Sequence, residues 1–382
     1  MFVIRLVSVL MVLFSPVLVN AKAILPVDTN DNKLVEALIN SSATLAEQVE
    51  ENYTFYGLAS YYNNANYYIV SRDELQKINA GVAVELNENQ WLAVVGRLNV
   101  LLIQATGLSA HLNESMLVID NPSIMNQSGV VVKMIPKSEL SSIASELDQI
   151  RYAHLWEPLA WLAKVVESSL VAIQAHVASN WGIAIVIFSV LLKLLLLPVG
   201  VMTVRLQRRV SQVQALLAPQ LAEIKANYDG EEAHNRLMAA HKGLGVSPFY
   251  TLKPMLGSLI QIPILIAVFN ALGEMPQLDG HPFLWIENLA YPDVIDHLPF
   301  AIPMLGNTIS LLPFIMTAVT LYSTIIFQNR HAPEGEMKRQ KRNLYLMAAA
   351  FFVLFYPFPA VMVLYWALAN ILQTVQQQIV KI

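Results

Sequence analysis

The segment at residues 180–202 constrains the fold of this chain more than any other, and it reads NWGIAIVIFSVLLKLLLLPVGVM. Nearly all of it is apolar, and it is about as long as the roughly 20 residues that a helix needs to cross a bilayer. Its one charge, Lys193, would cost about 2.5–3.5 kcal/mol at the centre of a membrane helix. We therefore expect Lys193 to face water, a polar partner or a cavity inside a helical bundle. The alternative is that its methylenes lie along the helix and carry the amine to the membrane interface.

The composition extends this expectation to the rest of the chain. Of 382 residues, 55% are hydrophobic and only 14% are charged, which predicts an α-helical polytopic membrane protein. The chain has no cysteine, so a disulfide framework, a thiolate metal site and a redox dithiol are excluded. The sequence shows no convergent Ser/His/Asp or metal-ligand pattern. We therefore predict no catalytic residues, no metal and no cofactor.

The first 155 residues predict an exported soluble part. Residues 1–23 combine Arg5, a short apolar run and a small-residue end, which is typical of a secretory signal peptide, with an uncleaved N-terminal anchor as the alternative. Residues 24–155 then predict a small exported α+β domain. Its expected elements are a helix at 32–51, a tyrosine-rich hairpin at 53–70, strands at 91–95, 99–105, 116–119 and 130–134, and a helix at 138–152 with Ser138 as a possible N-cap. The run at 91–103 fits a buried helix equally well.

The remaining residues predict five spans and a helical hairpin. Residues 156–179 predict an amphipathic helix in the outer interface, with Trp156 and Trp161 suited to the headgroup level. Residues 203–250 predict a polar hairpin of two helical arms, 205–228 and 231–243, joined at Asp229-Gly230. The spans are expected at about 180–202, 251–272, 308–328, 341–357 and 361–380.

The distribution of charge predicts the topology of these spans. Lysine and arginine concentrate in residues 203–253 and 329–343 and are absent from 273–307. By the positive-inside rule the two basic segments are cytoplasmic. The soluble domain and the acidic loop then lie outside, and the C-terminus lies inside. The expected location is the inner (plasma) membrane of a bacterial cell, and the N-terminal signal predicts the same orientation.

Several short motifs follow one another between Trp156 and Ile382. They are Asn180-Trp181-Gly182, the span with Lys193 and Pro198, the basic hairpin ending in Ser247-Pro248, Leu259-Ile260-Gln261-Ile262-Pro263-Ile264, Leu284-Trp285-Ile286, Leu312-Pro313-Phe314-Ile315-Met316, Phe358-Pro359-Ala360, Leu364-Tyr365-Trp366, Asn370 and Gln376-Gln377-Gln378. In this order the chain resembles the YidC/Oxa/Alb family of membrane protein insertases. Some features depart from that family. Lysine stands at position 193 where arginine is usual, the apolar residues 298–305 are inserted before the third span, and the exported domain at 24–155 is atypical of the family.

The resemblance implies a five-helix insertase bundle with a cytoplasmic hairpin and a hydrophilic, positively charged groove that handles nascent membrane proteins. The implied groove residues are Lys193, Ser189, Gln261, Thr317, Thr320, Tyr365, Trp366 and Asn370. The hairpin would recruit nascent chains, ribosomes or a Sec translocon through Arg205, Arg208, Arg209, Lys225, Arg236 and Lys242. No covalent chemistry and no specific nucleic acid recognition are implied.

Each of these positions also has a plainer explanation. Serine and threonine in membrane helices often bond their own backbone. Tyr365 and Trp366 suit interface anchors, and Gln261 and Asn370 suit bonds between helices. The basic residues of the hairpin could simply fix orientation and contact anionic lipid.

Two other kinds of protein remain open at this point. A secondary transporter or channel is one, although the five predicted spans contain no acidic or histidine residue that would carry proton coupling. A membrane-anchored envelope assembly factor that acts through its exported domain is the other.

Overall fold

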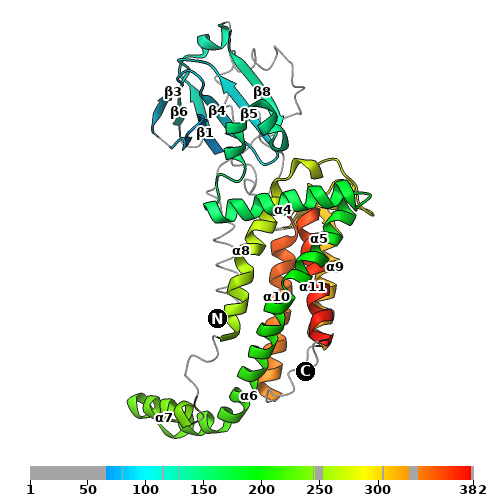
Figure 1. Cartoon of the computed structure of the whole chain (residues 1–382). Coiled ribbons are helices and arrows are strands. Elements are labelled where there is room, and N and C mark those ends of the chain that lie inside the picture. The colour runs from blue at the N-terminus through cyan, green and yellow to red at the C-terminus, as the bar shows by residue number, and fades with distance from the viewer. Residues whose placement is uncertain are drawn as a thin grey trace. The chain divides into compact units, whose positions relative to one another are not determined.

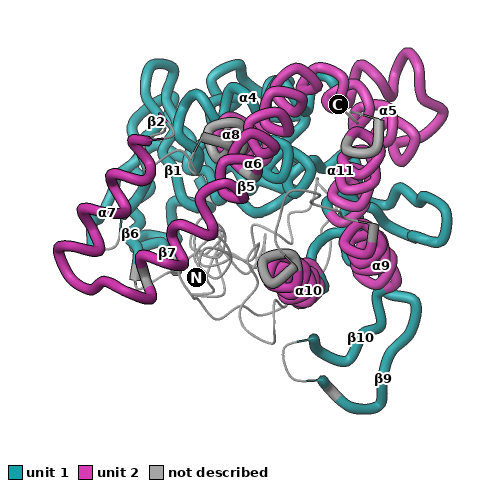
Figure 2. Tube along the Cα trace, turned by 90° about the horizontal axis from the view of Figure 1, so that it is seen from below, with its two compact units in different colours: residues 1–169, 267–310, 356–362 teal, residues 170–266, 311–355, 363–382 magenta. Residues whose placement is uncertain are grey.

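The structure is a computed structural model that describes residues 66–79, 81–113, 116–127, 129–243, 245, 253–302, 305–326 and 334–379. The chain divides into two compact units (Figure 2). The first unit comprises residues 1–169, 267–310 and 356–362, and the second comprises residues 170–266, 311–355 and 363–382. The predicted signal at 1–23, the helix at 32–51 and most of the tyrosine-rich hairpin lie outside the described residues.

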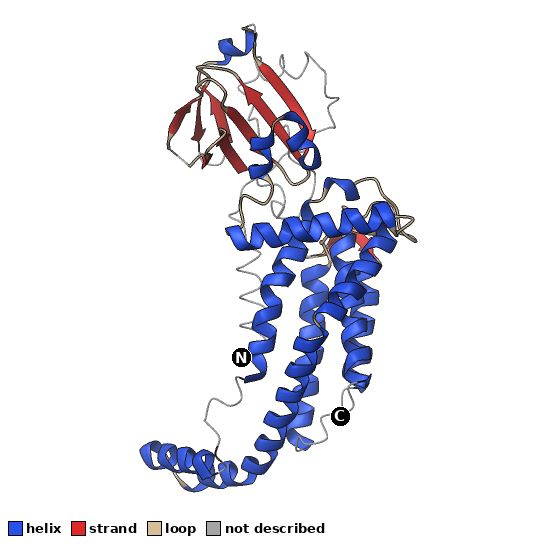
Figure 3. Ribbon diagram, in the orientation of Figure 1, coloured by secondary structure: helices blue, strands red, loops and turns tan. Residues whose placement is uncertain are grey.

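Two antiparallel sheets make up the N-terminal part of the first unit (Figure 3). The larger has the order β2-β1-β4-β5-β8, with β1 Asn66–Val70, β2 Leu75–Lys77, β4 Trp91–Val95, β5 Asn99–Gln104 and β8 Val131–Pro136. The smaller has the order β3-β6-β7, with β3 Ala83–Glu85, β6 Ser109–Asn113 and β7 Met116–Ile119. The four strands predicted between residues 91 and 134 are therefore confirmed, to within two residues at each end.

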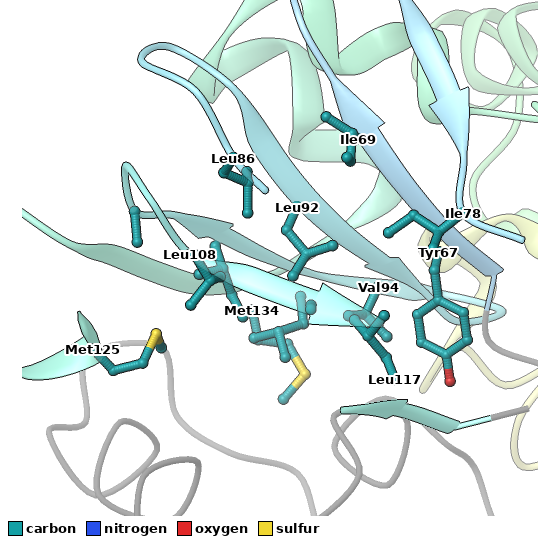
Figure 4. Close-up of a cluster of buried hydrophobic side chains, with 14 residues drawn as sticks. Tyr67, Ile69, Ile78, Leu86, Leu92, Val94, Leu108, Leu117, Met125 and Met134 are labelled. Carbon is teal, nitrogen blue, oxygen red and sulfur yellow. The ribbon is translucent and has the colours of Figure 1, made fainter. Parts of the chain in front are cut away.

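Both faces of the larger sheet are buried, which is why its strands look like buried helices in the sequence. Successive side chains of a strand point to opposite faces, so Tyr67 and Ile69 pack between the two sheets (Figure 4). Tyr68 and Val70 pack on the other face, against the residues that follow β8. With apolar side chains on both faces, no polar alternation remains to distinguish a strand from a helix.

The helix predicted at 138–152 is wrong as a continuous element. The segment forms three short pieces instead: η3 Lys137–Glu139, α3 Leu140–Ile143 and η4 Ser145–Ile150. Ala144 interrupts them with extended backbone (φ −156°, ψ 140°), and Glu139 rather than Ser138 precedes the α-helical turn, without a capping bond. Burial of Leu140, Leu147 and Ile150 against the sheet fixes this irregular path. Another 3-10 turn, η2 Pro122–Asn126, lies between β7 and β8.

The other parts of the first unit include the start of α4 (Glu157–His176), the end of α8 (Lys253–Glu274) and the loop that follows α8. On α4, Trp161 is 63% exposed, and Trp156 just before it is 73% exposed. The loop contains the turn η6 Pro276–Leu278 and a two-stranded hairpin of β9 Val294–Ile302 and β10 Gly306–Ser310. The third span predicted at 308–328 therefore starts too early. The helix α9 begins at Leu312. Pro313 lies in its first turn, where backbone N–H groups have no helical acceptor, so the N–H that proline lacks costs no hydrogen bond.

The second unit is helical (Figure 1). Its helices are α5 Trp181–Leu195, α6 Leu197–Asn227, α7 Gly230–Gly243, α9 Leu312–Ile326, α10 Glu334–Phe355 and most of α11 Ala360–Ile379, together with parts of α4 and α8. The two predicted hairpin arms appear as α6 and α7. Helix α10 starts at Glu334, within the basic segment at 329–343 and seven residues before the span predicted at 341–357.

The segment at 180–202 is not one helix, contrary to the prediction. Asn180 caps α5 by accepting the Ile183 N–H at 2.9 Å, but α5 ends at Leu195 and α6 starts at Leu197, with a bend of 57° between them. Pro198 lies in the first turn of α6 and has no N–H with which to continue the helical ladder. The N–H of Leu196 instead reaches the carbonyls of Leu192 and Leu194.

Among the described residues, no single helix meets the length and hydropathy of a complete membrane span. The bent pair of α5 and the first part of α6 meets them jointly, and shorter apolar stretches occur at Leu259–Glu274, Leu312–Ile325 and Ala360–Gln376. The number of five spans therefore stays a prediction.

Candidate functional site

Lys193 lies in the last turn of α5 and is half-buried. Its amine donates a hydrogen bond to Oε1 of Gln373 on α11, 180 residues further along the chain. The ion pairs formed by the described residues do not include Lys193. The described partner of the amine is thus a neutral amide, which accepts a hydrogen bond but does not neutralise the positive charge.

Further polar contacts join α9 to α11. Asn370 Nδ2 lies 3.5 Å from Oγ1 of Thr320, and Ser323 shares a short hydrogen bond with Thr374 one turn further along. Because Asn370, Gln373 and Thr374 are three and four residues apart, they share one face of α11. We call the set Lys193, Thr320, Ser323, Asn370, Gln373 and Thr374 the polar seam.

The hydroxyl groups predicted to line the groove bond their own helices. Ser189 is 4% exposed and donates to the Ile185 carbonyl at 2.7 Å. Thr317 donates to the Pro313 carbonyl at 2.7 Å, and Thr320 donates to the Met316 carbonyl at 2.9 Å. Each hydroxyl hydrogen is thus satisfied locally, which leaves Thr320 with an oxygen lone pair for Asn370.

The aromatic pair predicted for the groove packs among other side chains. The Trp366 ring lies 5.3 Å from that of Phe351 and 5.0 Å from that of Phe355, both on α10. Tyr365 is 8% exposed. Gln261 is half-buried on α8. The structure therefore brings Asn370 and Thr320 together, whereas Lys193 contacts a residue that the sequence reasoning did not select.

The sequence did not single out Gln373, Thr374 and Ser323, and it singled out Gln376 only as part of the motif Gln376-Gln377-Gln378, not as a groove residue. Their signal was the spacing of polar residues at three and four positions along α9 and α11. Gln376 is 5% exposed, and no hydrogen-bond partner for its amide occurs among the described residues. A Cβ on Gly200 would come within 2.5 Å of Gln376 Nε2, so the glycine permits this close approach of α6 and α11.

The basic residues of the hairpin are not equivalent. Arg205, Arg209 and Lys242 are exposed, Arg208 is half-buried, and the side chain of Lys225 lies outside the described residues. Arg236 is paired within α7, 2.9 Å from Oε1 of Glu232, and stacks 3.8 Å from the ring centre of Tyr228. The side chain of Arg236 therefore takes part in the described hydrogen bonds and ion pairs, whereas the side chains of Arg205, Arg209 and Lys242 do not.

A separate ionic cluster is buried in the first unit, around the carboxyl end of α8. Lys137, which follows β8, lies 2.6 Å from Oε2 of Glu274, and the two side chains are 7% and 12% exposed. His154 lies 3.3 Å from Oε1 of the same carboxylate. Arg97, in the turn between β4 and β5, donates to the carbonyls of Gly273 at 3.1 Å and Ala290 at 2.9 Å. Burial alone would raise the pKa of Glu274, but the charges of Lys137, His154 and Arg97 outweigh it and hold the pKa below its ordinary value.

Glu167 on α4 is a second carboxylate in the same unit, and it is 4% exposed. It accepts hydrogen bonds from Arg151 at 2.5 Å, Tyr152 at 2.7 Å and Gln277 at 3.1 Å. Burial and the charge of Glu167 raise the pKa of Tyr152 well above its ordinary value, so its hydroxyl remains a donor. Together, Glu274 and Glu167 fasten the sheets, α4 and the end of α8 into one unit.

Comparisons with known proteins were consistent with one another. A family model described as "60Kd inner membrane protein" matches residues 172–382. A protein of Chlamydia caviae named membrane protein insertase YidC is 32% identical over 232 residues, which is 59% of this chain and 28% of that protein. A protein of Amoebophilus asiaticus with the same name is 29% identical over 229 residues, covering 59% of this chain and 37% of that protein.

The chain thus spans well under half the length of the curated relatives that it matches. A crystal structure described as an active YidC insertase with the first transmembrane domain resolved aligns over 87% of this chain and 85% of that chain. That alignment has 16% sequence identity and a TM-score of 0.37.

Proposed function

Because the chain belongs to the 60Kd inner membrane protein family, the family of the YidC/Oxa/Alb insertases, we propose that it inserts integral membrane proteins and helps them to fold. Its relatives named as insertases are membrane proteins, and the site in the helical unit needs no bond-making chemistry for this task. The observation that carries the proposal is the half-buried amine of Lys193, whose described partner is a neutral glutamine.

The chemistry of this arrangement favours anionic client segments. The bond between Lys193 and Gln373 joins an ionised donor to a neutral acceptor. A client carboxylate in place of Gln373 would add an attraction between opposite charges that the amide does not supply. At an effective dielectric constant of about 20, two opposite charges about 4 Å apart attract by roughly 4 kcal/mol. The polar seam offers further donors and acceptors to a passing polar chain.

The apolar part of a client would supply the driving force for its own release. Moving a hydrophobic helix from water to lipid yields about 25 cal/mol per Å² of apolar surface removed from water. The polar seam therefore needs to lower only the free-energy barrier for moving the polar tail of the client, on either side of that helix, across the membrane. In this proposal Gln261, Ser189 and Thr317 line the path, and Tyr365 and Trp366 border it at the outer end of α11.

The proposed setting follows the charge distribution of the sequence. Residues 24–155 form the exported domain and residues 180–382 the five-span core in a bacterial inner membrane, with the α6–α7 hairpin and the C-terminus in the cytoplasm. Nascent membrane proteins are the proposed clients, with a Sec translocon and the ribosome as further proposed partners.

Depletion of the endogenous insertase and rescue by variants tests the role of Lys193. The client is a small membrane protein with an acidic exported tail. We expect Lys193→Ala to slow its insertion at least tenfold, because a loss of about 1.4 kcal/mol of attraction already gives that factor. We expect Lys193→Arg to retain insertion, since it keeps the charge.

Two controls sharpen this test. Lys77→Ala removes an exposed lysine from β2 and should leave insertion unchanged. Replacing the acidic tail residues of the client by their amides should abolish the difference between Lys193 and Lys193→Ala. Equal insertion of the acidic client by all variants would reject the role of the charge.

The helical hairpin is proposed to recruit clients. Helix α7 itself carries two acidic and two basic residues, Glu231, Glu232, Arg236 and Lys242, so it is balanced in charge. Two exposed arginines of the hairpin, Arg205 and Arg209, lie on α6 instead. Deleting residues 231–243 should abolish client insertion while the remaining helices still assemble, and unchanged insertion would reject recruitment by α7.

A further inference from the structure

The hairpin of β9 and β10, traced in teal in Figure 2, is unusually apolar for a loop. From Leu298 to Asn329 the chain contains no Asp, Glu, Lys, Arg or His. Phe300 is 62% exposed and Ile295 is 52% exposed. Among the described strands, β9 and β10 pair only with each other.

An isolated two-stranded hairpin with exposed apolar residues is marginally stable in water. The base of this hairpin, however, is fixed. Tyr356, which follows α10, donates to the Thr308 carbonyl at 2.6 Å and accepts the Ser310 N–H at 3.4 Å. Asp293, 4% exposed at the start of β9, accepts the Trp285 indole N–H at 3.3 Å. The base is therefore held in place while the apolar residues beyond it stay uncovered.

The turn that contributes Trp285 presents apolar side chains in the same way. Phe283 and Ile286 pair as an isolated bridge, and between them Leu284 has φ 56°. This left-handed conformation is rare for a bulky residue other than glycine, and such strain persists only where the surroundings impose it. It leaves Leu284 73% exposed and Trp285 40% exposed. We call Leu284, Trp285, Ile295 and Phe300 the apolar edge.

We propose that the apolar edge enters the hydrocarbon region of the outer leaflet and anchors the end of α9 to the bilayer. The reason to choose lipid over a protein partner is continuity. Only Leu311 separates β10 from α9, and the uncharged run continues through the whole of that apolar helix. After Asp296 and His297 no charged residue occurs before Arg330, so the run from Phe300 into α9 lacks the polar rim of a protein-binding patch.

Trp285 fits the same arrangement, because its indole N–H is bonded while its ring is partly exposed, as in side chains at the headgroup level. The inference depends on the membrane location proposed above but not on insertase activity. It also gives a use to the apolar insertion at 298–305 that sets this chain apart from the usual family pattern.

The absence of cysteine makes a direct test possible, since one introduced cysteine can carry a unique label. The full chain is reconstituted in phosphatidylcholine vesicles with an environment-sensitive fluorophore at Phe300→Cys. We expect doxyl-labelled lipid to quench the fluorophore at least twice as strongly as it quenches a label at Val82→Cys. Val82 is the matched control, an exposed apolar residue (50%) of the N-terminal sheets. Aqueous iodide should quench the two labels in the reverse order.

A third label, at Leu191→Cys on the apolar helix α5, separates failure of this inference from failure of the membrane location. Leu191 is 51% exposed in the chain and should be quenched by lipid in any membrane-spanning arrangement. If Leu191 is quenched by lipid but Phe300 is quenched by iodide, the apolar edge lies in water and the inference is wrong. If Phe300 is shielded from both quenchers, the edge is covered by protein and the inference is equally wrong.

Discussion

Replacing Glu274 by glutamine should loosen the first unit where the sheets meet the end of α8. The substitution keeps the volume and most hydrogen-bonding capacity of the side chain but removes its charge. Lys137, whose side chain is 7% exposed and 2.6 Å away, then remains buried without its counter-charge. Breaking a buried pair from one side costs about 3–5 kcal/mol.

The pairing with Lys137 can be isolated by a double-mutant cycle. Lys137→Met together with Glu274→Gln removes both charges, and replacing a whole buried pair by neutral groups of similar volume is often close to neutral. We therefore expect the double variant to recover most of the stability lost in Glu274→Gln, with a coupling energy of about 1–3 kcal/mol. His154 and Arg97 keep part of the positive charge near position 274, so the recovery should be incomplete.

Native-state hydrogen exchange in reconstituted protein measures the effect. Amides of residues 137–155 and 267–278 should exchange roughly a hundredfold faster or more in Glu274→Gln, since each 1.36 kcal/mol is a factor of ten. The matched control is Glu232→Gln, which breaks an ion pair whose side chains are 49% and 62% exposed and should change exchange in α7 only slightly. Unchanged exchange in Glu274→Gln, or equally fast exchange in the double variant, would refute the assignment of Glu274 and Lys137 as a stabilising pair.

Three further outcomes are expected. Because the pKa of Glu274 is held below its ordinary value of 4.5, its charge stabilises the first unit fully above that pH and progressively less below it. Lowering the pH should therefore accelerate hydrogen exchange in residues 267–278 of the unsubstituted chain, whereas Glu274→Gln, which already exchanges fast, should show no such dependence on pH. Gly200→Ala should lower stability by about 1–3 kcal/mol, because the added methyl group would overpack against Gln376. Adding Gln376→Ala to the same chain should restore the thermal midpoint. A midpoint that stays low would contradict the contact between positions 200 and 376. Gln373→Leu should lower the free energy of unfolding by about 1–3 kcal/mol, because it removes the hydrogen-bond acceptor of Lys193. Gln373→Asn keeps an amide acceptor on a shorter side chain and should lower it less in the same thermal assay.

The sequence predicted those elements whose cause is local. The arms of the hairpin follow from helical periodicity and the Asp229-Gly230 turn, and the strands around Trp91 follow from short apolar runs between turn residues. The break in the segment at 180–202 also has a local cause, because Pro198 has no N–H for the helical ladder and α5 ends at Leu195, just before it.

Contacts between distant parts of the chain left no comparable signal. Gln373 is 180 residues from Lys193, so nothing near the lysine identified its acceptor. The same holds for Lys137 and Glu274, because each looks like a solvated charge until the fold buries both. The sequence of the β9–β10 hairpin indicates only an apolar insertion, because its residues alternate too weakly between polar and apolar to predict strands.

The break at Leu196 lies far from the distal end of α6 but close to Lys193. From this joint α6 extends for 31 residues, or about 46 Å at 1.5 Å per residue. A swing of about 5° about Leu196 would carry the far end of α6 through about 4 Å, but would move a point at the distance of Lys193 by only a few tenths of an ångström. Such a swing would therefore displace the distal end of α6 while the ammonium group of Lys193, close to the break, stays almost stationary.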